Sequence, residues 1–432
     1  MKTKICRLGV AVGSAALLVM ALAASLVAAS PTGRFVLLTT TSAGSLIVES
    51  RPSLDNAGHW LAFHSDSDIL GQGIPEYQSE VWLYQIGTMT TTRVTTSSDG
   101  MSRDSWNPSL SADGTKVAFE SDSSFPGHTI PDNQFEIWLY DRVARTYTRV
   151  TTSTPASRVS ENPSLNEDGT VIAFASDSAF WGGTIPVTQL EIWLYDIPSA
   201  TFTRVTTGTT AYLPGLAQSN HPSLSGDGTR IAFESNTNFL NPSEGTRTEI
   251  WLYDTQTLTF TRVTTASGSD RESLEPAISL DGTKIAFQSD SNLAGHVITA
   301  EHYEIWLYDI AAMTYTRVTT STGSGYRWST TPSLDRTGSQ VIFSSDSDLL
   351  HEGIGDNMHE IWRYDVPTGQ LTRLTRNSNT NRDSWLPRIS ANGRLIAFVS
   401  DSNLLNVGLS DDQYEFWLYD SRERLYLPLV LR

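Results

Sequence analysis

Histidines are the first candidates for chemistry in this 432-residue chain. Seven of the eight fall at one end of a repeated strand unit, in or beside expected loops, and only His59 falls at the other end. The seven are His64, His128, His221, His296, His302, His351 and His359. Imidazole is a common ligand of divalent transition metals, so convergence of His128, His302 and His359 would build a metal site. Single histidines spread over several units are otherwise typical of a loop surface.

Aromatic side chains in the same loops are candidates for ligand binding. Of the 12 tryptophans, seven recur at one position of the repeat and Trp60 falls in an expected strand, which leaves four in loops. Rigid scaffolds often use Trp and Tyr on loops as binding anchors. The alternative is that these rings cover the cores of the loops. The candidate binding residues are Trp106, Trp181, Tyr212, Tyr326, Trp328 and Trp385.

Four polar positions recur in most units and predict one buried hydrogen-bonded network per unit. The aspartates are Asp66, Asp122, Asp177, Asp290, Asp346 and Asp401, with Asn236 in the fourth unit. The glutamates are Glu80, Glu136, Glu191, Glu249, Glu304, Glu360 and Glu415. The arginines are Arg103, Arg158, Arg271, Arg327 and Arg382, and the serines are Ser105, Ser160, Ser219, Ser273, Ser329 and Ser384. The carboxylates would also suit calcium, although the arginine already supplies positive charge beside them.

A repeat that runs through the chain positions these residues. Its anchor prolines are spaced 54 to 59 residues apart, at Pro52, Pro108, Pro163, Pro222, Pro276, Pro332 and Pro387. In the second unit, strands are expected at 108–111, 116–120, 136–141 and 147–151, because these segments are β-branched and aromatic and turn residues separate them. An Asp-Gly pair between the first two strands indicates a hairpin.

Seven units of four strands, without a helical period of useful length, predict an all-β fold. The expected architecture is a seven-bladed β-propeller of four-stranded antiparallel blades. The seven regular tryptophans of the third strands are expected to pack between neighbouring blades. They are Trp82, Trp138, Trp193, Trp251, Trp306, Trp362 and Trp417.

The pattern PSLSxDGTxIAFxSDS…EIWLYD…TRVTT resembles the TolB-type, WD40-like (PD40) propeller repeat over about residues 35 to 423. The resemblance implies a propeller of the kind found in exported bacterial proteins and beside some peptidases. That family spans transport accessories, lyases and peptidase gating domains, so the resemblance is specific for the fold rather than for one function. This chain lacks the extra N-terminal α/β domain of TolB and has long loops between the second and third strands.

The N-terminus predicts export. Residues 1–29 combine a basic start, an apolar run and small residues before Ala29, which is the pattern of a cleaved signal peptide. A retained membrane anchor is the weaker alternative. Cleavage removes the only cysteine, Cys6, and changes the formal net charge from -17 to -20 by removing three cationic residues. The acidic product disfavours nucleic acid and anionic membrane surfaces as partners. We expect an extracellular or cell-envelope (periplasmic) protein that is a monomer.

Two segments compete to close the ring. Residues 30–50 form a leader in which 35–40 has the spacing of the outer strand of blade seven, and residues 51–423 form the propeller. The tail 424–432 fits the same slot, as an edge strand or a docking tag. The N-terminal segment is favoured, because closure by the opposite end of the chain joins the ring non-covalently.

Three functions remain open from the sequence. The chain contains neither a G-x-S-x-G elbow nor an H-E-x-x-H pair, and no residues remain for a hydrolase domain, which favours a non-catalytic scaffold that binds a protein, peptide or glycan. No cofactor is expected for such a scaffold. The alternative is a metal-assisted, uronate-lyase-like enzyme that uses the loop histidines. A purely structural module is a third possibility.

Overall fold

The structure is a computed structural model, and it describes most of the chain in separate ranges. These are residues 27–30, 33–40, 51–75, 78–96, 103–131, 134–154, 158–208, 217–241, 245–266, 271–299, 302–321, 325–354, 358–376, 382–410 and 413–422. Tyr212, most of the predicted signal peptide and the tail 424–432 lie outside the described residues.

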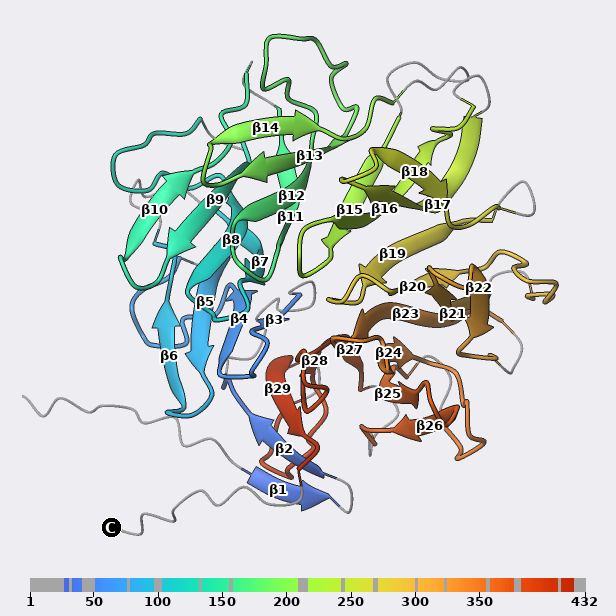
Figure 1. The fold of residues 1–432 in the computed structure, drawn as a ribbon. Coiled ribbons are helices and arrows are strands. Elements are labelled where there is room, and N and C mark those ends of the chain that lie inside the picture. Colours follow the sequence, from blue (N-terminus) through green and yellow to red (C-terminus); the bar gives the residue numbers. More distant parts are fainter. Residues whose placement is uncertain are drawn as a thin grey trace, which may run out of the picture.

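The described strands form seven blades around a common centre (Figure 1). Blades one to three contain β3 (Ser53–Leu54), β4 (Trp60–Ser65), β5 (Glu80–Gln85), β6 (Thr90–Arg93); β7 (Ser105–Leu110), β8 (Lys116–Ser121), β9 (Glu136–Asp141), β10 (Thr146–Arg149); β11 (Ser160–Leu165), β12 (Val171–Ser176), β13 (Glu191–Asp196) and β14 (Thr201–Arg204). Blades four and five contain β15 (Ser219–Leu224), β16 (Arg230–Thr237), β17 (Gly245–Asp254), β18 (Thr259–Arg262); β19 (Ser273–Ile278), β20 (Lys284–Ser289), β21 (His302–Asp309) and β22 (Thr314–Arg317). Blades six and seven contain β23 (Arg327–Leu334), β24 (Gln340–Ser345), β25 (Glu360–Asp365), β26 (Gln370–Arg373); β27 (Ser384–Ile389), β28 (Leu395–Ser400), β29 (Glu415–Asp420), β2 (Gly33–Leu37) and β1 (Val27–Ser30).

Strand order within the blades confirms the predicted fold class. Blades one to four are four-stranded antiparallel sheets, and blades five and six are joined into one sheet by a parallel contact between β21 and β23.

The ring has two faces. The hairpin turns between first and second strands lie on one side, which we call the turn face. On the other side, which we call the loop face, lie the loops between second and third strands and the connections between blades. The Asp-Gly turn is confirmed in blade two, where Gly114 has a φ of 65°. A Cβ atom there would lie 2.6 Å from the Trp60 ring.

The N-terminal segment closes the ring. β2 pairs antiparallel with β29 of blade seven, with Phe35 opposite Tyr419 and Leu37 opposite Trp417 (Figure 1). β1 adds a fifth strand outside β2. This is the position that the spacing of the sequence favoured. The predicted cleavage point near Ala29 falls within β1, so β2 lies in the part of the chain that cleavage would leave.

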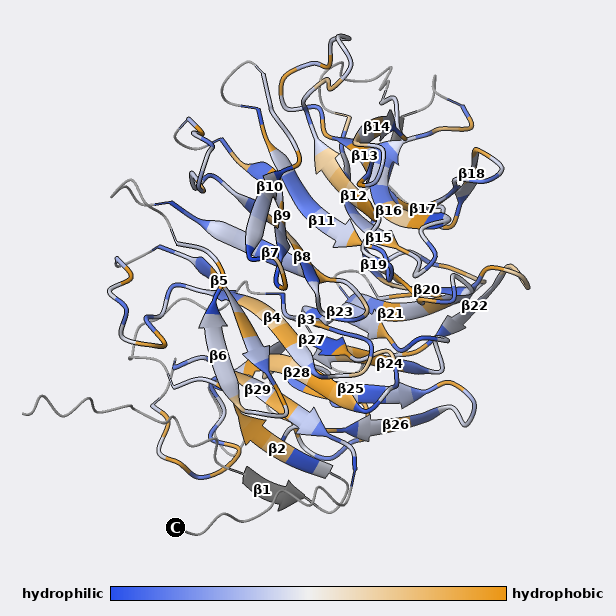
Figure 2. Cartoon of the chain, turned by 60° about the vertical axis from the view of Figure 1, so that its left-hand side comes forward, coloured by the Kyte–Doolittle hydropathy of each residue, from blue (hydrophilic) through white to orange (hydrophobic). Residues whose placement is uncertain are grey.

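The core of the protein lies between blades. One buried cluster joins Val81 and Leu83 of blade one to Val117, Phe119 and Trp138 of blade two. All seven tryptophans of the third strands are at most 1% exposed, which matches their expected place between blades. Figure 2 shows hydrophobic residues on inner strands such as β4, β12 and β28 and on β2.

Backbone hydrogen bonds between adjacent hairpin turns run around the turn face. An amide of each turn donates to a carbonyl oxygen of the turn in the next blade, and a side-chain amide makes the contact from blade seven to blade one. The contacts are Asn56–Ala112, Ala112–Glu167, Glu167–Gly226, Gly226–Leu280, Asp281–Arg336, Arg336–Ala391 and Asn392–Ala57. The blades are therefore tied together at the centre as well as through their side chains.

Within the described ranges, the chain forms no helix that is both long and apolar enough to span a bilayer.

Candidate functional site

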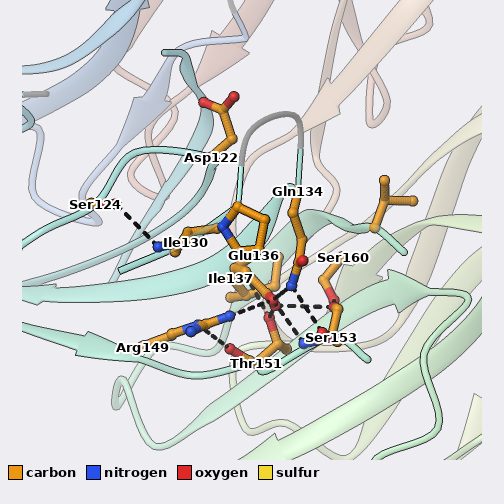
Figure 3. Close-up of polar contacts among 12 residues, drawn as sticks. Asp122, Ser124, Ile130, Gln134, Glu136, Ile137, Arg149, Thr151, Ser153 and Ser160 are labelled. Atoms are coloured by element: carbon orange, nitrogen blue, oxygen red, sulfur yellow. Dashed lines mark hydrogen bonds and ion pairs between the residues drawn. The ribbon is translucent and has the colours of Figure 1, made fainter. Parts of the chain in front are cut away.

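Each blade buries the glutamate at the start of its third strand, and Glu136 in β9 illustrates the arrangement (Figure 3). Its carboxylate accepts hydrogen bonds from Arg149 at 2.8 Å and from the Gln134 side-chain amide at 2.6 Å. The Thr151 hydroxyl and both the backbone N–H and hydroxyl of Ser153 also donate to it. A fully buried carboxylate with this many donors is a satisfied structural group rather than a free ligand for a metal.

The arginine in this cluster comes from the fourth strand, which corrects the prediction that a loop arginine would pair with the glutamate. The pairs are Glu80–Arg93, Glu136–Arg149, Glu191–Arg204, Glu249–Arg262, Glu304–Arg317 and Glu360–Arg373. In blade seven the closing segment brings the Thr39 hydroxyl to Glu415 at 2.6 Å, and Leu37 occupies the register position of the arginine. The sequence prediction grouped the glutamate with the loop arginine because both lie at the same end of the blade, whereas the structure pairs it with the arginine of the adjacent fourth strand.

The loop arginines and the Ser-Asp-Ser aspartates form a second cluster in each blade that has them. The Oδ1 atom of Asp122 accepts the Asp104 N–H at 2.7 Å, and its carbonyl oxygen accepts from Arg103. Arg103 also donates to the carbonyl oxygens of Ile130 at 3.3 Å and Pro131 at 3.2 Å. Asp122 lies apart from the Glu136 cluster (Figure 3). The single predicted network is therefore two clusters, and this second one fixes the long loop to the blade.

Other blades repeat the second cluster. The same arginine-to-carbonyl contact occurs at Arg158–Asp177, Arg271–Asp290 and Arg382–Asp401. Arg327 lies 3.8 Å from the carboxylate of Asp346. Blade four replaces both charged residues together, because Asn236 stands for the aspartate and the buried Ala217 for the arginine. The Asn236 side chain still accepts the Gln218 N–H at 2.9 Å, so the aspartate position serves mainly as a hydrogen-bond acceptor.

The recurring serines connect strands and blades. Their hydroxyls pair with the serine that ends the second strand at 2.8 to 3.0 Å. The pairs are Ser105–Ser121, Ser160–Ser176, Ser219–Ser235, Ser273–Ser289, Ser329–Ser345 and Ser384–Ser400. Ser153 of blade two also lies 3.4 Å from Ser160 of blade three, which links the Glu136 cluster to the next blade.

The loop aromatics divide into covered and exposed residues. Trp106 stacks on Phe135 with ring centroids 4.7 Å apart, and the half-buried Trp385 stacks on His359 at 3.5 Å. These two rings cover loop cores. Three others are exposed: Trp181 by 53%, Tyr326 by 61% and Trp328 by 46%. Trp181 also leans on the core residue Trp193, whose ring centroid is 4.5 Å away.

Trp328, two residues after Tyr326, lies on a backbone that is held in place. β23 begins beside β21 in a parallel pair that sets His302 opposite Arg327 and Tyr303 opposite Trp328. The Trp328 N–H donates to Asp346 Oδ1 at 2.8 Å, and the Tyr303 ring meets Trp328 edge-on with centroids 6.4 Å apart. We call Tyr303, Tyr326 and Trp328 the aromatic platform.

The loop histidines have separate local partners. His128 meets the Trp138 ring edge-on, His302 Nε2 lies 2.9 Å from the Gly325 carbonyl oxygen, and His359 stacks on Trp385. In the described part of the chain, no three His, Cys, Asp or Glu side chains are grouped as a metal site. The convergence that a lyase-like metal centre needs is not seen for these three histidines.

A second candidate site, which was not predicted from the sequence, lies in the central channel. First strands of all seven blades surround a cavity of about 270 Å³. The residue before the anchor proline is asparagine in blades two and three and differs in each of the other blades, and in blades two to seven it has a positive φ of 48–56°. These residues are Asn107, Asn162, His221, Glu275, Thr331 and Leu386, with Arg51 at the same position in blade one. A left-handed conformation before proline is strained, and such strain occurs often at functional sites.

A β-bulge accounts for that conformation and for several buried polar residues. The register of the first two strands shifts around this residue, for example between Trp106 and Ser109. The bulge amide then points at the preceding blade and donates to a side chain on its second strand. The contacts are Asn107 to His64, Asn162 to Glu120, Glu275 to Glu234 and Thr331 to Gln288. Bulges that re-aim side chains are common beside binding sites.

Charged residues from distant blades meet inside this channel. Arg51 of blade one bonds Glu275 of blade five at 2.6 Å, so the ion pair crosses the channel. His221 Nδ1 lies 2.8 Å from Glu234. Burial raises the pKa of Glu275, but Arg51 and His221 outweigh it and hold that pKa at about 2. Burial also lowers the pKa of His221, and Glu275 with Glu234 more than reverses this shift.

Glu120 predicts a pH-dependent stability. Burial, and secondly the Glu161 carboxylate, raise the pKa of Glu120 to about 7 from 4.5. A raised folded-state pKa gives a stabilisation that is present below pH 4.5 and is lost as pH rises through 7. Glu120→Gln, which mimics the protonated acid, should therefore gain about 3 kcal/mol relative to the native chain between pH 5 and pH 8. Urea unfolding of both proteins at the two pH values measures this. A pH-independent difference between them would contradict it.

Comparisons with known proteins show the fold alone. No protein-family model matches the chain, and no curated protein does. Solved structures match along most of their length. An oligogalacturonate lyase from Vibrio parahaemolyticus is 11% identical with a TM-score of 0.57, covering 92% of this chain and 96% of that one. An oligogalacturonate lyase in complex with manganese is 14% identical, with the same TM-score and the same coverage.

A third match bears on ring closure. The β-propeller domain of the Trilobed protease from Pyrococcus furiosus is 12% identical with a TM-score of 0.55, covering 89% of this chain and 96% of that one. That domain is described as having an open velcro topology, whereas β2 pairs with β29 here. The chain therefore has the β-propeller fold. The finer TolB-type assignment, export and envelope location stay predictions.

Proposed function

We propose that this chain is an exported, non-catalytic binding scaffold whose loop face binds a protein, peptide or glycan. The N-terminal apolar segment supports export. The repeated clusters support a scaffold role, because their Asp, Glu, Arg and Ser side chains make contacts between strands and loops.

The aromatic platform is the observation that carries the proposal. Most of the tryptophans in this fold are enclosed, yet Trp328 is 46% exposed and Tyr326 is 61% exposed. Other blades have Asp104, Val159, Gln218, Glu272 or Asp383 at the position of Trp328. Because its backbone is pinned to β21 and Asp346, the Trp328 ring is presented with little conformational freedom left to lose on binding. Rigid exposed aromatic residues are typical binding anchors.

A binding screen with matched variants tests the proposal. Labelled protein is applied to glycan and peptide arrays, and the affinity of each ligand found is then measured in solution. Trp328→Ala should weaken binding by about 30-fold or more, as expected for loss of an anchor worth about 2 kcal/mol. Trp181→Ala is the control, because Trp181 is equally exposed but lies on blade three. Equal losses from both variants, or none from Trp328→Ala, would contradict the proposal.

A further inference from the structure

The channel contains a second departure from the repeat, at the residue after each anchor proline. Five blades have serine there, and each serine hydroxyl accepts a backbone N–H from the first strand of the next blade. The contacts are Ser53–Leu110, Ser109–Leu165, Ser164–Leu224, Ser223–Ile278 and Ser333–Ile389. Blade five has Ala277 and blade seven has Arg388. The serine therefore links neighbouring blades. Arg388 places a charged side chain at a position that is uncharged in the other six blades.

Arg388 lies in the wall of the channel cavity together with Arg51, Glu275 and Glu167. The two glutamates are already paired, Glu275 with Arg51 and Glu167 with Arg336. Among the described residues, the Arg388 guanidinium makes one hydrogen bond, to the Pro387 carbonyl oxygen at 2.9 Å. Burial, followed by the nearby Arg51, lowers the pKa of Arg388 to about 10. A guanidinium has five N–H donors, so most of the hydrogen-bonding capacity of Arg388 is not used by the described residues.

We infer that Arg388 binds the carboxylate of a small ligand within the channel, at a site distinct from the loop face. A guanidinium donates two parallel hydrogen bonds to a carboxylate, and such charge-assisted bonds are strong where water is scarce. The charges also favour a monoanion. Glu275 is bound to Arg51 and also lies near Arg388, and the Glu234 and Glu120 carboxylates lie near Arg51. The positive charge that remains available to a ligand is therefore that of Arg388. A dianion such as phosphate would meet more repulsion from Glu275 and Glu167.

Size and access support a small ligand. The cavity of about 270 Å³ lies near the lower end of ligand-binding cavities, which suits a monosaccharide or a dipeptide. Its wall reaches the turn face at Asn56, Glu167 and Ala391. Arg336 and Asn56 both bond Glu167 at that mouth, and the Arg336 side chain is 46% exposed. An exposed ion pair contributes little free energy, so an entering ligand can separate Arg336 from Glu167 at a small free-energy cost.

Calorimetric titration with matched ligand pairs tests the inference. Glucuronate and glucose differ by the carboxylate, and N-acetyl-alanylalanine and its C-terminal amide differ in the same way for a peptide source. At least one of the two acids should bind the full chain, and its neutral partner should bind at least tenfold more weakly. Arg388→Ser, which restores the serine of the other blades, should weaken binding of that acid by about tenfold to a hundredfold. Which acid binds identifies the source of the carboxylate.

Two controls separate this inference from the loop-face proposal. Trp328→Ala should leave carboxylate binding unchanged, since the aromatic platform lies on the other face. Arg388→Gln provides a second variant of similar length if Arg388→Ser unfolds more easily in a thermal melt. The inference is overturned if neither acid binds, if the neutral partners bind equally well, or if the Arg388 variants retain native affinity.

Discussion

Replacing Glu136 by alanine is expected to lower the free energy of unfolding by about 3–5 kcal/mol. The substitution leaves Arg149, which is largely buried, without its carboxylate and removes the acceptor for Gln134, Thr151 and Ser153. Removing one partner from a buried ion pair is costly because the remaining charge has no access to water. Urea unfolding monitored by tryptophan fluorescence measures the change.

The matched control is an exposed ion pair. Glu352 contacts Arg376 at 3.0 Å, and the Arg376 side chain is 66% exposed. Arg376→Ala removes the exposed partner and leaves Glu352 within 3.8 Å of Arg373, so it should change the free energy of unfolding by less than about 1 kcal/mol. If Glu136→Ala were no more destabilising than Arg376→Ala, the glutamate clusters would not hold the blades together as described.

Removing residues 1–40 is expected to destabilise the propeller by about 5 kcal/mol or more, because Phe35 and Leu37 leave the core together. These residues are 8% and 4% exposed, and Phe35 packs against Phe398 and Tyr419. The truncated chain also loses the β2–β29 hydrogen bonds that close the ring. Thermal unfolding of the truncated protein measures the loss.

Two further samples isolate ring closure from truncation itself. A chain starting at residue 30 keeps β2 and should unfold like the full chain. A synthetic peptide of residues 27–40 should restore much of the lost stability when added to the truncated protein, and a scrambled peptide should not. Unchanged stability after removal of residues 1–40 would show that β2 does not close the ring.

The fold could be predicted because the residues that determine a blade recur in every copy of the repeat. Each Asp-Gly turn, each third-strand tryptophan and each anchor proline occurs where the blade requires it, so seven copies indicate seven blades. Ring closure followed from the spacing of residues 35–40. The pairing of Glu136 with Arg149 was not predicted, because alternation along a strand gives the face of a side chain but not which neighbouring strand it reaches.

The channel was missed for a related reason. The bulge at Asn107 re-aims residues on either side of Pro108, and nothing in the first-strand pattern shows where Arg51 or Arg388 point. The signal was present, since the residues flanking the anchor prolines vary while the prolines do not. The parallel contact that supports Trp328 depends on tertiary position and leaves no pattern in the sequence.

The central claim is that binding occurs where the chain departs from its repeat, on the aromatic platform. Fluorine NMR of protein labelled with 5-fluorotryptophan tests it most directly, because the seven buried tryptophans act as internal controls. On addition of a loop-face ligand found in the array screen, the Trp328 resonance, assigned with Trp328→Ala, should shift while those of Trp138 and its six counterparts stay in place. An unchanged Trp328 resonance under saturating ligand would contradict the account.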